Sequence, residues 1–190
     1  WDSQRGLVKR PFTIDTWDFE YDENNKTGGS LDRRIRETSK MSIMHGDNSG
    51  VYQAMNQLAW FNRRLGNEEK ALDWEKRAEE LKENIFKYLW NGDFFIHQLH
   101  INHNGADSLE NVRLSLSNSY DMNRGLTNLE ESRKIIEEFL RRRETTEFFA
   151  EWFSIDPPYE DFLGYPAGRY INGAISPFAA GELSKAAFAN

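Results

Sequence analysis

The fold of this chain is decided by residues 64–90, which read RLGNEEKALDWEKRAEELKENIFKYLW. Glycine often ends a helix and asparagine often caps the next, so Gly66 and Asn67 predict a sharp turn between two helices. After the turn, apolar residues recur at helical spacing as far as about Trp90. The predicted inward positions are Ala71, Leu72, Trp74, Ala78, Leu81, Ile85 and Leu89. The stretch therefore predicts a hairpin of two helices.

The first helix of this hairpin is expected to start at Asn48 or Ser49, because either residue type can cap a helix. Its apolar positions are Val51, Met55, Leu58, Ala59 and Leu65. Outward from the hairpin, further segments follow in a regular order. Helices are predicted over residues 109–126, from Thr127 or Asn128 to 142, and over 172–189; irregular segments over 1–47 and 144–169; extended pieces near 12–21 and 93–103.

This order of segments predicts an all-α fold of antiparallel hairpins with long loops on one side. Residues 67–81 resemble one helix of a tandem repeat, but no second copy follows at a period of about 34 residues. A repeat solenoid is therefore disfavoured.

The composition narrows the class of protein. The chain has 190 residues, of which 38% are hydrophobic and 29% charged, and its net charge is −7. An acidic balance disfavours nucleic acid, whose phosphates attract clusters of Lys and Arg. No apolar run approaches the ~20 residues that a membrane span needs. The absence of cysteine excludes disulfides, thiolate metal sites and cysteine nucleophiles.

Carboxylates alternate with aromatic residues in IDTWDFEYD at residues 14–22. On an extended chain Asp18, Glu20 and Asp22 share one face, and the aromatic residues share the other. An apolar wall raises the pKa of a carboxyl and so suits a general acid, while an aromatic face can hold a sugar ring. An ordinary amphipathic edge strand has the same pattern, so the pattern alone leaves both interpretations open.

Two further stretches combine small, polar and aromatic residues. Residues 45–50 read HGDNSG and offer Asp47 and Asn48 at a helix start, as caps, as ligand contacts or as both. Residues 147–173 contain Glu151-Trp152 and the donors Arg169, Tyr170 and Asn172. Small residues there let a backbone approach a ligand, although such a loop could equally cover the helices with its own aromatics.

Three histidines, His97, His100 and His103, suggest a metal site at first. On a strand, however, His97 and His103 share one face and His100 points to the other. Without cysteine or an H-E-x-x-H pattern, we expect no metal.

The order of these stretches resembles that of the six-hairpin glycosidases, in particular the inverting trehalases and processing α-glucosidases. DTWDF at residues 15–19 stands where the family has S-G-[WM]-D, and GDNSGVY at 46–52 resembles D-x-N-x-x-[LY] at a helix start. KYLWN at 87–91 resembles the Leu-Trp-Asn/Asp that ends the second helix of a hairpin. GYPAGRYINGAISP at 164–177 resembles the Y-x-x-G and N-G-x-x-x-P stretches.

The resemblance implies an (α/α)6 toroid, with residues 1–190 forming part of one catalytic domain truncated at both ends. It implies that Asp18 is the catalytic acid. Asp15 is the second candidate, because Asp15-Thr16 replaces the Ser-Gly of the motif. The base is expected to be a Glu, either downstream of Asn190 or, in the trehalase order, Glu151.

The implied activity is inverting hydrolysis of an α-linked glucoside or mannoside, with a carbohydrate as partner and no cofactor. The expected substrate contacts are Trp17, Asp47, Asn48, Trp152, Arg169, Tyr170 and Asn172. The alternatives are a sugar phosphorylase or lyase on the same toroid and a non-catalytic carbohydrate-binding protein. Neither a nucleic acid nor a membrane is expected as a partner.

Overall fold

The computed structural model describes residues 1–14, 35, 37–102, 109–146, 149–162 and 164–189. Within these ranges the helices are α1 (His45–Arg64), α2 (Glu68–Leu89), α3 (Ser117–Asn123), α4 (Leu129–Thr145) and α5 (Pro177–Ala189), with a 3₁₀ turn at Glu110–Val112. The described chain is therefore rich in helix.

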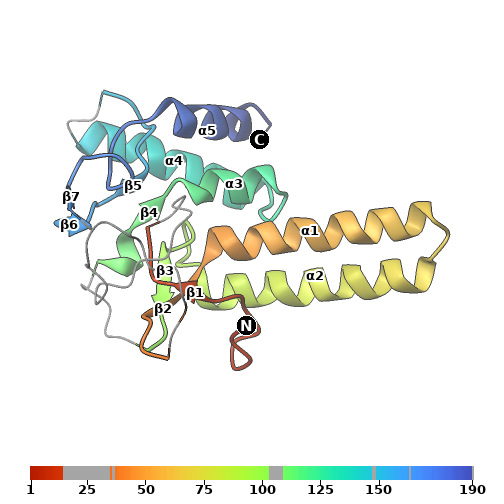
Figure 1. The fold of residues 1–190 in the computed structure, drawn as a ribbon. Helices are drawn as coiled ribbons and strands as arrows, with labels where there is room; N and C mark the ends of the chain where they lie inside the picture. The colour runs from red at the N-terminus through yellow and green to blue at the C-terminus, as the bar shows by residue number, and fades with distance from the viewer. Residues whose placement is uncertain (15–34, 36, 103–108, 147–148, 163, 190) are drawn as a thin grey trace.

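The helices form two sets that run in opposite directions (Figure 1). The outgoing helices α1, α3 and α5 start at one end of the molecule, and α3 packs between α1 and α5. The returning helices are α2, which packs along α1, and α4, which packs on α5. We call the end where the outgoing helices start the loop end and the opposite end the turn end. The predicted hairpin of α1 and α2 is confirmed.

The turn end consists of two short connections. Residues 65–67 join α1 to α2, and Gly66 there has a φ of 76°, which glycine adopts without the steric cost that a Cβ brings. Residues 124–128 join α3 to α4, where Asn128 and Glu131 form a reciprocal capping box. The helix-stop signal of Gly66 and the cap of Asn128 are thus confirmed, whereas the Asn67 side chain makes no capping hydrogen bond.

Every strand in the described residues lies near the loop end, in the segment before α1 or in the long connections between helices (Figure 1). β1 (Arg10–Pro11), β2 (Met41–Met44) and β3 (Gln98–His100) form one antiparallel sheet in that order. β4 (Leu114–Ser115) pairs with β5 (Ile155–Asp156), and β6 (Asp161–Phe162) pairs with β7 (Tyr165–Pro166). The strand expected near residues 93–103 is present as β3, whereas the expectation that strand would be confined to this piece and to 12–21 is wrong, because long loops pair their backbone groups with one another. The described fold is helix-rich with three small antiparallel sheets rather than purely helical.

Three helix boundaries also differ from expectation. α1 starts at His45 directly after β2, and neither Asn48 nor Ser49 caps it. The helix expected over residues 109–126 is interrupted, because Leu114 and Ser115 pair with β5 and leave a 3₁₀ turn before them and α3 after them. The last helix starts at Pro177 rather than near 172, which suits a residue whose missing N–H costs nothing in a first turn.

The main core is one cluster of buried apolar side chains to which several helices contribute. It includes Leu81, Ile85 and Leu89 of α2 and Ile135 and Phe139 of α4, all almost fully buried. Other predicted inward positions are exposed, namely Leu58, Leu65 and Leu72. A second, smaller cluster consists of Ile14, Ile155, Tyr159, Phe162 and Ile171, with Phe12 against it.

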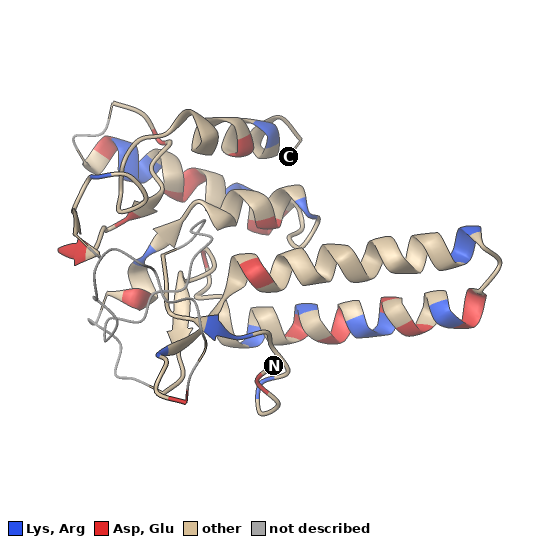
Figure 2. Cartoon of the chain, in the orientation of Figure 1, with Lys and Arg blue, Asp and Glu red and all other residues tan. Residues whose placement is uncertain are grey.

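The charges fall unevenly on the helices. Figure 2 shows both signs along the whole of α2, whereas α1 carries none between Asp47 and Arg63. None of the described helices combines the length and the apolar character that crossing a membrane requires.

Candidate functional site

The starts of the outgoing helices bring three separate segments to the loop end. α1 contributes Asp47 in its first turn, α3 contributes Tyr120, and α5 contributes Phe178. The rings of Tyr120 and Phe178 lie 6.1 Å apart between centroids, so α3 and α5 present adjacent aromatic groups.

A cavity of about 390 Å³ opens beside the start of α5. We call it the Tyr170 cavity; its lining is Leu116, Ser154, Tyr170, Ile171, Ala174, Ile175, Ser176, Pro177 and Phe178. Tyr170 and Phe178 are more than half exposed, at 59% and 57%. An apolar wall with a few hydroxyl groups suits a ring that is apolar on its faces and polar at its edge, as a sugar is.

Basic side chains continue this surface toward α1. The Arg124 guanidinium lies 5.1 Å from the centre of the Tyr120 ring and donates hydrogen bonds to the Gly46 carbonyl and the Ser49 hydroxyl, at 2.7 and 2.8 Å. One residue beyond Gly46, an oxygen of the Asp47 carboxylate is 3.3 Å from Nη1 of Arg10. A chain of contacts therefore links the start of α5 to the start of α1.

Two expected substrate contacts are buried and hold the backbone. The Asn48 amide accepts from the Val8 N–H at 2.7 Å and donates to the carbonyls of Val8 and Met44. The Asn172 amide accepts from the Tyr159 N–H at 2.8 Å and donates to the carbonyls of Tyr159 and Tyr165. Contact of either amide with a sugar stays a prediction.

The remaining expected residues of the long aromatic loop lie in two places. Arg169 and Tyr170 are exposed, and Tyr170 lines the cavity that carries its name. Glu151 instead lines a separate cavity between α4 and α5, where its carboxylate lies 3.4 Å from Arg143. Trp152 is partly buried against the main core. The structure therefore separates Glu151 from Tyr170, and the catalytic role of Glu151 stays a prediction.

Asp15, Trp17 and Asp18 lie outside the described residues. The described chain before them nevertheless leads to the site, because Ile14 is fully buried in the same cluster as Ile171. Ile14 directly precedes Asp15, and Ile171 directly follows Tyr170. The buried cluster thus joins two segments that are far apart in the sequence. One ends directly before Asp15 and the other directly follows Tyr170.

Behind the site, His45 bridges two other buried residues. Its Nδ1 is 2.5 Å from the Asp121 carboxylate, and its Nε2 is 3.0 Å from the Ser115 hydroxyl. This is the order of a Ser-His-Asp triad, but a nucleophile must reach its substrate and the Ser115 side chain is fully buried. The arrangement ties the start of α1 to α3 and to β4.

A second buried network, the Glu110 cluster, consists of Glu110, His97, His100, Arg113, Tyr159 and Gln98. Tyr159 donates its hydroxyl proton to the Glu110 carboxylate at 2.5 Å, and His100, Arg113 and His97 approach the same carboxylate at 3.2, 3.2 and 3.4 Å. The expectation that His97 and His100 point apart is wrong, because both reach Glu110 from opposite ends of a short segment.

The electrostatics of this cluster follow from burial and hydrogen bonding. Burial opposes ionisation of Glu110, but hydrogen bonds from His100 and His97 outweigh it and hold the pKa of the carboxyl well below its usual range. Burial, reinforced by the Glu110 charge, raises the pKa of the Tyr159 hydroxyl. Glu110 is therefore a charged acceptor and Tyr159 a neutral donor. Among the residues that the structure describes, no group of three or more His, Cys, Asp or Glu side chains is arranged to hold a metal ion.

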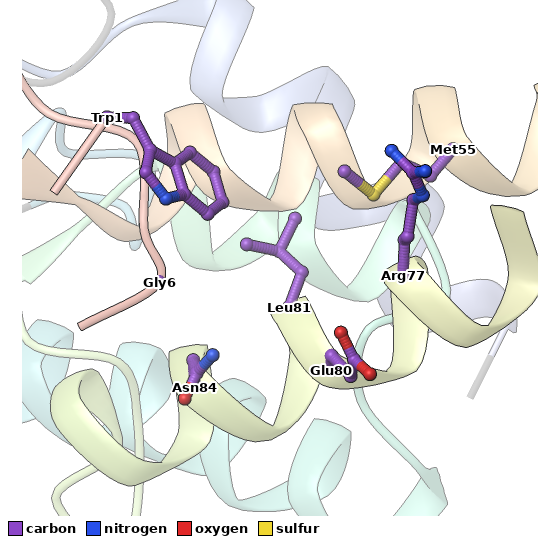
Figure 3. A pocket seen from close by; sticks show the side chains of 7 residues that line it. All are labelled: Trp1, Gly6, Met55, Arg77, Glu80, Leu81 and Asn84. Carbon is purple, nitrogen blue, oxygen red and sulfur yellow. The ribbon is translucent and has the colours of Figure 1, made fainter. Parts of the chain in front are cut away.

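Another cavity of about 390 Å³ lies on the side of the α1–α2 hairpin (Figure 3). In that view the Trp1 indole stands opposite Leu81, and the other labelled side chains come from the middle of α1 and α2. Its Arg77 is already paired with Asp73 at 2.9 Å. This Trp1 cavity contains none of the residues expected to act on a sugar, so the loop end is the better candidate site.

Four residues of the site were not expected from the sequence: Arg10, Tyr120 and Phe178 at the loop end, and Arg124, which belongs to the α3–α4 connection but reaches the first turn of α1 with its side chain. Tyr120 and Arg124 lie in a segment expected to be one continuous helix, where nothing distinguished them from surface residues. Phe178 directly follows the Ser176-Pro177 helix start, which was a usable signal.

The fold and the site together define a class: a protein of helical hairpins whose long loops gather aromatic and charged side chains at one end. The chain belongs to the trehalase family, since the model of that family matches residues 13–151. The resemblance to the six-hairpin glycosidases is thereby confirmed at the level of the family. No curated protein matches the chain.

Proposed function

We propose that this chain is part of a glycoside hydrolase that acts with inversion on an α-linked glucoside or mannoside, with the sugar bound at the loop end. The observation that carries the proposal is the packing of Ile14 with Ile171 in one buried cluster. It joins the segment that leads to Asp15 and Asp18 to the loop that carries Arg169 and Tyr170. Because the chain belongs to the trehalase family, we take the two segments to be parts of one sugar-binding site.

The proposed architecture is an (α/α)6 toroid in which residues 1–190 form part of a single catalytic domain. α1, α3 and α5 would be inner helices and α2 and α4 outer ones. Two features favour this arrangement. α1 carries no charge between Asp47 and Arg63, yet Trp60 and Phe61 are more than half exposed. In a toroid, further hairpins would cover such apolar faces.

In the proposed mechanism Asp18 protonates the leaving oxygen while a second carboxylate activates water. The two carboxyls of an inverting enzyme lie ~6.5–9.5 Å apart, which leaves room for that water. Tyr170 and Phe178 would stack on the sugar, and the Ser176 hydroxyl and Arg169 would bind its edge. Asp15 is the alternative acid. Glu151 is kept as a candidate base, although it is paired with Arg143 in a separate cavity.

The test is product analysis in the complete protein with α-linked gluco- and manno-disaccharides. Hydrolysis should release a reducing sugar, and NMR of the first product should show the inverted anomer. A sugar 1-phosphate formed only with added phosphate would identify a phosphorylase instead, and an unsaturated product would identify a lyase. Binding without any product would favour the non-catalytic carbohydrate-binding protein.

A further inference from the structure

The Glu110 cluster lies directly under the loop that carries Tyr170. Arg113 is fully buried, with its guanidinium carbon 3.7 Å from the centre of the Tyr159 ring, and it donates to the Pro157 carbonyl at 3.0 Å. The Tyr159 hydroxyl donates to Glu110 and accepts from the Gln98 amide at 2.8 Å. Both the ring and the hydroxyl of Tyr159 are therefore held.

The backbone of Tyr159 is in turn hydrogen-bonded to the segment that carries Tyr170. Its N–H and its carbonyl both bind the Asn172 side chain, at 2.8 and 2.9 Å. Asn172 is two residues from Tyr170, and the next residue, Gly173, donates its N–H to the Ser154 hydroxyl at 3.0 Å. Tyr170 itself has a φ of 49°, which a tyrosine adopts only where its surroundings require it.

Filling a core does not explain such a cluster. Burying a carboxylate and a guanidinium costs free energy, and apolar residues of similar size would often stabilise a fold as well or better. What a buried polar network adds is one defined geometry, because each hydrogen-bonded donor and acceptor has a fixed direction.

We propose that the Glu110 cluster positions the Tyr170 loop, residues 159–162 and 164–172, so that the Tyr170 ring is preorganised for a sugar. Tyr159 and Glu110 are then positioning residues, which act on the sugar through Tyr170 and do not touch it. This inference rests on the proposed function, since it takes the Tyr170 cavity as the sugar site.

Tyr159→Phe is the sharpest variant, because it keeps the ring that packs on Arg113 and removes only the hydroxyl. Tyr88→Phe, on the returning helix α2, is the matched control. Affinity is measured by titration with trehalose, methyl α-glucoside and methyl α-mannoside, alone and in a Tyr170→Gly background. Hydrogen exchange is followed at the amides of residues 159 and 173, with α2 amides as the reference. Glu110→Gln serves if Tyr159→Phe does not fold.

Tyr159→Phe should weaken binding by about threefold to tenfold, a usual size for coupling through packed neighbours, and should speed exchange at residues 159 and 173. The loss of affinity should vanish in the Tyr170→Gly background, because the two residues act in series. Tyr88→Phe should change neither quantity. An equal loss in both backgrounds, or unchanged exchange at both amides, would overturn the inference.

Failure of the proposed function would look different. If the wild-type chain binds none of the three sugars, the sugar site is wrong, and the exchange data alone then decide whether the cluster fixes the loop. Faster exchange in Tyr159→Phe would preserve the positioning role, and unchanged exchange would remove it.

Discussion

The two ends of the helices are built in different ways. At the turn end, two short connections are specified by residues that are close in sequence, and charged pairs such as Arg63 with Glu75 are partly exposed to solvent. At the loop end, segments from all parts of the chain meet, and Glu110, Arg113, His45 and Asp121 are buried. Exposed ion pairs contribute little to stability, whereas buried charges are tolerated only in a precise network.

The difference between the two ends indicates which of them is suited to a binding site. A turn that is specified by residues close in sequence can lose its cap at the cost of some stability, because the cap bonds only near neighbours. A loop end that needs long-range partners holds a defined surface, which is what a binding site requires. Substitutions at the loop end should therefore change sugar binding or turnover, and those at the turn end should change only the free energy of unfolding.

The largest effect is expected from Asp18→Asn in the complete protein. Loss of a general acid typically lowers the rate by about 10²–10⁴-fold, and sugar binding and folding should be nearly unchanged. The loss should be smaller for nitrophenyl or fluoride glycosides, whose leaving groups need little protonation. Steady-state kinetics give the answer, with Asp15→Asn as the milder control. If Asp15→Asn abolishes turnover and Asp18→Asn does not, the acid is Asp15.

A smaller effect is expected from Tyr170→Gly, which should weaken sugar binding without lowering stability. Loss of the ring should weaken sugar binding by roughly tenfold, or about 1.4 kcal/mol. Glycine adopts a positive φ without strain, so the free energy of unfolding should stay level or rise by up to about 1 kcal/mol. Calorimetric titration and chemical denaturation measure the two quantities. A large loss of stability with unchanged affinity would show that Tyr170 is structural.

At the turn end, Asn128→Ala should lower the free energy of unfolding by about 1 kcal/mol, because it removes the capping box with Glu131. Sugar affinity should not change. Asn67→Ala is the matched control and should cost less, because Asn67 makes no capping hydrogen bond with its side chain. Equal losses of stability for the two variants, measured by denaturation, would contradict this account of the turn end.

The smallest effect is expected from Glu151→Gln. The Glu151 carboxylate faces Arg143 in its own cavity, so its removal should lower stability by less than about 1 kcal/mol. Turnover should stay within about a factor of two, well short of the loss expected for a general base. Turnover that falls as far as in Asp18→Asn would identify Glu151 as the base.

The same contrast explains what the sequence could predict. Gly66, Asn128 and the apolar spacing of α2 act on near neighbours, so the hairpin and the turn end could be read directly. The pairing of Leu114 and Ser115 with β5 could not, because its partner lies some forty residues away in the chain and the local pattern still favoured a helix. Asn48 and Asn172 illustrate the limit for the site. Their amides bind backbone groups that are distant in the chain, and the sequence alone could not reveal these partners.

Backbone amide shifts on titration with trehalose and methyl α-mannoside show directly whether a sugar binds at the loop end. We expect saturable shifts at Tyr170, Ser176 and Phe178, spreading to Tyr120 and Asp47, with residues 65–67 unchanged. Shifts confined to Gly6 and Asn84 of the Trp1 cavity, or to residues 65–67, would contradict this placement of the sugar.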